Sequence, residues 1–108
     1  MERLTASPSG KYTDNSIRLR TESDNQITLQ LNYSTTPTEI SYQISHVPNI
    51  TKALSSGGIV LGDDGNYTVT ISESDNLNVG IYKHYVTITD GNGTFKAALD
   101  KGRVRVED

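Results

Sequence analysis

Several residue types that stabilise small domains or carry chemistry are scarce in this sequence. Cysteine and tryptophan are absent from its 108 residues, phenylalanine occurs once and histidine twice. Without cysteine the chain has no disulfide framework and no thiolate chemistry, which argues against a typical secreted eukaryotic module. Stability must therefore come from an ordinary apolar core. A chain of this length is long enough to form one, since folding buries roughly two-thirds of its surface.

Strong charge and long apolar runs are also missing. Ten basic residues against thirteen acidic ones give a net charge of −3. Such a chain lacks the positive footprint of a nucleic-acid or anionic-lipid binder. No run approaches 18 apolar residues, and the opening "MERLTASPSG" lacks an apolar signal core. We therefore expect no nucleic-acid partner, no membrane partner, and synthesis in a cytoplasm without Sec-type export.

Apolar residues recur instead at period two, the spacing that places side chains on one face of a β-strand. The clearest case is "QITLQLNY", and turn residues interrupt the pattern every eight to twelve positions. Residues 73–78 have room for one helical turn, and Asp90 to Gly93 (Asp-Gly-Asn-Gly) predicts a tight hairpin. The predicted strands are 16–20, 26–33, 39–46, 50–54, 59–61, 66–72, 80–89, 94–99 and 103–107.

This pattern predicts an all-β protein, a single immunoglobulin-like β-sandwich of about seven antiparallel strands over residues 16–108. Residues 1–15 contain Pro, Gly and Ser without periodicity, and we interpret them as an extended N-terminal arm. The arginine pairs at 18 and 20 and at 103 and 105 are spaced by two. Each pair therefore lies on one strand face, which we interpret as solvated.

The stretch "NLNVGIY" indicates a structural corner. In immunoglobulin-type sandwiches a tyrosine near the start of the penultimate strand bonds to backbone of the preceding crossover. Leu77 would close the end of the core, Gly80 would permit a sharp turn, and Tyr82 would supply the bonded hydroxyl. The alternative is an ordinary strand start with a half-exposed tyrosine.

Candidate chemistry is sparse. His46 and His84 stand in phase with apolar neighbours, so we interpret them as half-buried or edge residues and not as a metal or acid–base pair. The runs 63–66 (Asp-Asp-Gly-Asn) and 90–93 carry oxygen ligands but lack the calcium-loop spacing, which favours simple turns. We expect no catalytic residue, no cofactor and no metal, and hence no enzymatic activity.

The order of motifs along residues 16 to 107 resembles phage and prophage Ig-like β-sandwich proteins. It is most similar to the N-terminal domain of phage baseplate upper proteins. The motifs are "TESDNQITLQL", "EISYQIS", Gly65 to Ile71, Gly80-Ile81-Tyr82, Val86 to Gly93 and "GRVRVED". The resemblance implies a virion structural module that makes protein–protein contacts. Those relatives continue into helical or fibre-forming regions, whereas this chain runs only from Met1 to Asp108. We therefore expect it to be a free-standing accessory unit.

These observations predict a non-enzymatic bacteriophage virion protein outside the main shell. It would serve as a capsid decoration or cement protein, or as an adaptor at the neck, tail, baseplate or fibres. Its partners would be other virion proteins, with self-association a further option because edges around residues 50–61 need cover. We expect the arm to reach a partner through Arg3, Leu4 and Tyr12. The alternative function is a carbohydrate-binding or adhesin-like module, which usually presents exposed aromatic residues.

Overall fold

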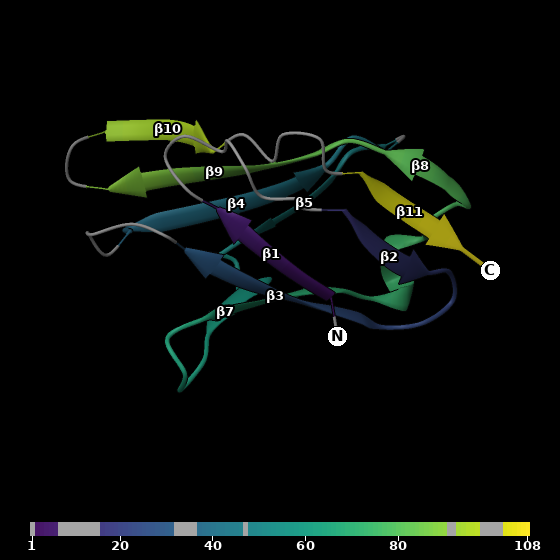
Figure 1. The fold of residues 1–108 in the computed structure, drawn as a ribbon, viewed down its shortest axis with the longest axis horizontal. Coiled ribbons are helices and arrows are strands. Elements are labelled where there is room, and N and C mark those ends of the chain that lie inside the picture. Colours follow the sequence, from purple (N-terminus) through teal and green to yellow (C-terminus); the bar gives the residue numbers. More distant parts are fainter. Residues whose placement is uncertain (1, 7–15, 32–36, 47, 91–92, 98–102) are drawn as a thin grey trace.

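The computed structural model describes residues 2–6, 16–31, 37–46, 48–90, 93–97 and 103–108. Within these residues the chain forms eleven strands and one 3-10 turn, η1 (Glu73–Asp75), so the protein is all-β (Figure 1). The strands are β1 (Glu2–Ala6), β2 (Ile17–Arg20), β3 (Asn25–Leu31), β4 (Glu39–Ile44), β5 (Ile50–Ala53), β6 (Ile59–Leu61), β7 (Tyr67–Ile71), β8 (Gly80–Tyr82), β9 (His84–Asp90), β10 (Gly93–Ala97) and β11 (Val104–Glu107).

The strands form a sandwich-like arrangement. One sheet has the order β1-β3-β7-β6 and a second has the order β10-β9-β4-β5. A third, smaller sheet has the order β2-β11-β8. Only Lys83 separates β8 from β9, and β11 pairs with β8 as β10 pairs with β9. The small sheet therefore continues the second one, and Figure 1 shows it at the end of the molecule that holds the C-terminus.

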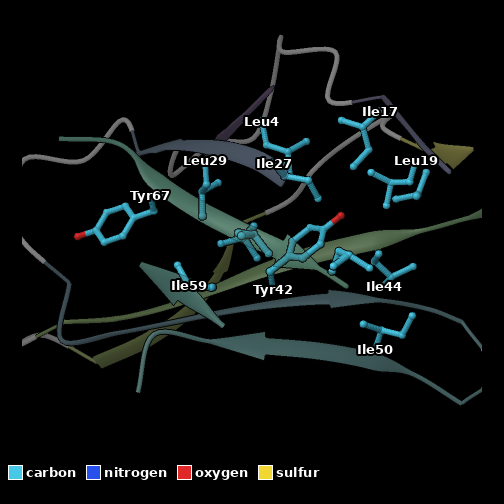
Figure 2. Packing of buried hydrophobic residues seen from close by; sticks show 14 of the residues in the cluster. Leu4, Ile17, Leu19, Ile27, Leu29, Tyr42, Ile44, Ile50, Ile59 and Tyr67 are labelled. Atoms are coloured by element: carbon cyan, nitrogen blue, oxygen red, sulfur yellow. The ribbon is translucent and has the colours of Figure 1, made fainter. Parts of the chain in front are cut away.

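The core lies between the sheets and follows the period-two pattern of the sequence. In β4 and β7 every second residue is buried, because alternate side chains of a strand point to opposite faces. Figure 2 shows these side chains converging from several strands. The buried apolar residues are Leu4, Ile17, Leu19, Ile27, Leu29, Ile40, Tyr42, Ile44, Ile50, Ile59, Tyr67, Val69, Ile71, Leu77, Val86, Ile88, Val104 and Val106.

The predicted strands match the observed ones within two residues at most ends, and the predicted helical turn is η1. The long strand predicted over residues 80–89 is divided at Lys83. There β8 pairs with β11, whereas β9 begins opposite Ile44 of β4. The chain thus leaves one sheet and enters the next without a turn. This one break and the additional strand β1 raise the nine predicted strand ranges to eleven observed strands, more than the seven or so expected for the sandwich.

The N-terminal prediction needs correction. Residues 2–6 form β1, which pairs in parallel with β3, and Leu4 opposite Leu29 is fully buried. This part of the predicted arm therefore belongs to the sheet and the core. A second parallel pair joins β2 to β11, so the strands are not all antiparallel. Two parallel strands cannot be joined by a tight hairpin, and so no turn motif in the sequence predicts their pairing.

Candidate functional site

The crossover from β7 to β8 ends in a tyrosine that bonds back to it. The Tyr82 hydroxyl donates a hydrogen bond to the carbonyl oxygen of Asn78 at 2.9 Å. A Cβ added to Gly80 would lie 2.8 Å from the Tyr82 hydroxyl oxygen and 3.1 Å from Cζ. Glycine is therefore required for the ring to lie against this backbone. Leu77, at the start of the same segment, is buried at the edge of the core.

His46 bonds to the same crossover residue as Tyr82. Its Nε2 accepts a hydrogen bond from the Asn78 N–H at 3.0 Å, and so the ring proton is on Nδ1. Nδ1 donates to the carbonyl of Pro48 at 3.2 Å. The imidazole packs on Tyr82 with ring centroids 4.8 Å apart. Only 3% of His46 is exposed, so the half-buried or edge interpretation of this residue was wrong.

His84 is equally buried and pairs with a different tyrosine. A hydrogen bond of 2.7 Å joins His84 Nδ1 to the Tyr42 hydroxyl, between the adjacent strands β9 and β4. The two rings meet edge to face with centroids 5.6 Å apart. Burial raises the pKa of Tyr42 well above its ordinary value, and the hydroxyl stays protonated. The expected edge position of His84 was likewise wrong, since its phase with apolar neighbours places it inside.

The acidic runs serve as turns. Oδ1 of Asp64 accepts the Asn66 backbone N–H at 3.0 Å, and Oδ2 accepts the Asn66 side chain at 3.3 Å. Gly65 adopts a φ of 83°, which glycine tolerates best. The run that begins at Asp90 joins β9 to β10. These strands are antiparallel, and Asp90 opposite Gly93 is the first pair of their register. Among the described residues, no group of three or more His, Cys, Asp or Glu side chains is placed to hold a metal ion.

The outer face of the small sheet, which we name the arginine face, is rich in arginine and also carries Glu107, which lies opposite Arg20. Four of the five arginines of the chain are exposed on β2, on β11 or next to it: Arg18, Arg20, Arg103 and Arg105. Arg105 stands directly opposite Arg18 on one side and Ile81 on the other. An open hollow of about 550 Å³ lies here, lined by Ser16, Ile17, Arg18, Ile81, Arg103 and Arg105.

The electrostatics of the arginine face favour an anionic partner. Within the part of the chain that the structure describes, neither Arg18 nor Arg105 makes an ion pair. Like charges directly opposite each other on neighbouring strands destabilise a sheet. A carboxylate or another anion at this position would relieve the repulsion. The spacing of two predicted that each arginine pair lies on one exposed strand face, but no sequence pattern indicated that the two pairs would meet.

The residues predicted to contact a partner have different placements. Leu4 is fully buried beside Leu29, and it cannot reach another protein while β1 stays in the sheet. The expectation for Leu4 is therefore wrong. Arg3 lies in β1, but its side chain is outside the described structure, as is the whole of Tyr12. The contact predicted for these two residues stays a prediction.

Comparison with known proteins adds no relative. No protein-family model matches the sequence, and a search of curated proteins finds no significant match. In the described part of the chain, no helix is long and apolar enough to cross a membrane.

Proposed function

We propose that this protein is a non-enzymatic structural component of a bacteriophage virion, built on an immunoglobulin-like sandwich. The observation that carries the proposal is the corner. The Tyr82 hydroxyl bonds to backbone four residues upstream, where the chain enters the long strand segment of β8 and β9, which β10 and β11 follow. That arrangement is typical of immunoglobulin-type sandwiches. It supports the motif order on which the resemblance to phage Ig-like proteins rests.

The proposed role is that of an exterior accessory, either a capsid decoration protein or an adaptor at the neck, tail or fibres. Its work is to bind other virion proteins through its surface. The arginine face supports this role, because the exposed apolar side chain of Ile81 next to Arg105 resembles the composition of protein interfaces.

The carbohydrate-binding alternative finds less support. Sugar-binding sandwiches usually stack aromatic rings on the sugar. Among the described residues, the exposed large apolar side chains are all aliphatic: Val60, Leu61, Val79 and Ile81. A glycan array with the purified protein tests this alternative, and reproducible binding to one glycan class would favour it.

The number of copies per particle tests the virion proposal most directly. Quantitative mass spectrometry of purified particles, normalised to the major capsid protein, measures it. Hundreds of copies would indicate a capsid decoration protein, and a few to a few dozen would indicate the neck, tail or fibres. Absence of the chain from particles that were assembled while it was expressed would overturn the proposal.

A second test concerns the N-terminus. Deleting residues 1–15 would also remove Leu4 from the core, and so the deletion would confound assembly with stability. Replacement of Arg3 by Glu and of Tyr12 by Ala avoids this problem. If the N-terminus contacts a partner, these variants should keep the stability of the wild type and enter particles less efficiently. Full incorporation would remove Arg3 and Tyr12 from the interface.

A further inference from the structure

Two exposed surfaces of this molecule are complementary in charge and in apolar character. The first is the arginine face, where Ile81 is 61% exposed beside Arg105, with Arg18 on the next strand; all three line the same hollow. The second surface, which we name the acidic turn, comprises residues 60–64. Val60 and Leu61 are 56% and 55% exposed there, and Asp63 and Asp64 are exposed next to them. Each surface thus offers aliphatic side chains near charged ones: Arg105 and Arg18 stand in register with Ile81, while Glu107 of the same face lies opposite Arg20.

We propose that the protein self-associates head to tail, with the acidic turn of one copy seated in the hollow of the arginine face of the next. The carboxylates of Asp63 and Asp64 would accept hydrogen bonds from the guanidinium groups of Arg18 and Arg105. Leu61 would cover Ile81. This inference does not depend on a virion role, because it concerns the isolated chain.

The acidic turn has free capacity for such bonds. Asp63 makes no hydrogen bond within the described residues, and each oxygen of Asp64 accepts one from Asn66. A carboxylate offers about four acceptor sites in total. Backbone hydrogen bonds from Gly62 to Asn66 at 2.8 Å and from Gly65 to Gly62 at 3.2 Å close the turn. The turn is therefore preorganised, which lowers the entropic cost of binding.

The positions of the two surfaces exclude an internal contact. Figure 1 shows the turn that precedes β7 towards one end of the molecule, and β2, β8 and β11 at the other end. The longest extent of the chain is 39 Å. A contact between different surfaces on two copies is heterologous, and it produces open chains or rings instead of a closed dimer. The hollow of about 550 Å³ is within the size range of ordinary binding pockets.

Sedimentation velocity of the purified protein over a concentration series, up to about 1 mM, tests the association. At about 50 mM NaCl the mean mass should rise with concentration beyond that of a dimer. At about 1 M NaCl the protein should return to the monomer, because the screening length falls to about 3 Å. A monomer at every concentration and salt would overturn the proposal.

Two double variants locate the contact. Arg18→Gln with Arg105→Gln removes the donor charges. Asp63→Asn with Asp64→Asn removes the acceptor charges, while the amide oxygen introduced at position 64 can still accept the hydrogen bond from the Asn66 backbone N–H. Each should weaken association by about tenfold, as expected for two exposed ion pairs. As a control, Glu22→Gln with Glu73→Gln removes two negative charges from other exposed positions and should leave association unchanged.

Mixing the two double variants gives the sharpest result. One variant keeps an intact turn and the other keeps an intact arginine face, so the mixture can form one wild-type contact per pair. It should give a 1:1 complex that stops at two chains, whereas each variant alone stays largely monomeric at the same concentration. Association that survives in both variants would overturn the proposal and move the contact elsewhere, for example to the edge of β6.

Discussion

Two tyrosine–histidine pairs in this protein differ in where their polar atoms find hydrogen-bond partners. Inside the sandwich, Tyr42 and His84 bond to each other at 2.7 Å, and both are almost fully buried. At the corner, Tyr82 and His46 pack ring on ring, but each directs its polar atoms to backbone. The first pair joins the Tyr42 hydroxyl to His84 Nδ1 within the core, whereas the second holds the crossover in place.

The difference shows what a buried polar ring can contribute. The internal pair joins β4 to β9, which the sheet already holds by backbone bonds. Its hydrogen bond mainly avoids the cost of leaving polar atoms unpaired in an apolar interior. The corner pair restrains residues 78 and 79, which belong to no strand. We therefore expect the internal pair to dominate stability and the corner pair to control local geometry.

Replacing Tyr42 with Phe should have the largest effect. The change keeps the ring but removes the hydroxyl bonded to His84 Nδ1, and we expect a loss of about 2 kcal/mol in the free energy of unfolding. Urea denaturation measures it. Tyr67→Phe is the control, because that ring is buried while its hydroxyl points away from the cluster (Figure 2). Equal losses in the two variants would contradict the expectation.

Replacing Gly80 with Ala should cost about 1.5 kcal/mol, because the new methyl group would overlap the Tyr82 ring. In a Tyr82→Ala background the same change should cost much less, since the ring it strikes is gone. The coupling energy from this double-mutant cycle isolates the contact. If the cost of Gly80→Ala is the same in both backgrounds, the close approach is not its cause.

Tyr82→Phe should cost less than Tyr42→Phe, about 1 kcal/mol. Its hydroxyl bonds to the Asn78 carbonyl at the surface, where water can replace the lost donor. Faster amide exchange of residues 78 to 80 should accompany the loss, because the crossover loses one restraint. A loss of stability as large as that of Tyr42→Phe would remove the distinction between the two pairs.

We expect the smallest effect on stability when acid protonates Asp75, whose ion pair with Lys52 joins η1 to β5. Partial burial raises the pKa of its carboxyl, but Lys52 at 2.8 Å and the Ser72 amide and hydroxyl outweigh burial, so the pKa lies below its usual value. A lowered pKa contributes stability above the usual value near 4, and that stability is lost as the pH falls through the folded-state pKa.

We expect this contribution to stay below about 1 kcal/mol, because it comes from one ion pair near the surface. Denaturation between pH 2 and 7 measures it, and Asp75→Asn should flatten the curve below about pH 4. Tyr42→Phe should leave that part of the curve unchanged, which separates the acid response from the internal pair. An identical acid response in Asp75→Asn and wild type would show that other groups cause it.

Much of the fold could be predicted from local patterns. Period-two spacing indicated the strands, and the Asp-Gly-Asn-Gly run indicated the hairpin between β9 and β10. The Gly80 and Tyr82 motif pointed to the crossover, because the interacting atoms are separated by only a few residues. The predicted half-buried or edge position of the two histidines was wrong. Their phase in the strands was correct, but the polar partners that allow their full burial come from other segments of the chain.

Neighbours along the chain set which residues form strands and which face of each strand is apolar, and so both could be read from the sequence. Strand pairing depends instead on how distant segments pack. The parallel pairing of β1 with β3 turned a predicted arm into part of the sheet. The pairing of β2 with β11 set Arg18 opposite Arg105, from the other end of the chain, and so created the arginine face. No local pattern encodes such contacts, because each needs two segments that meet only in the folded protein.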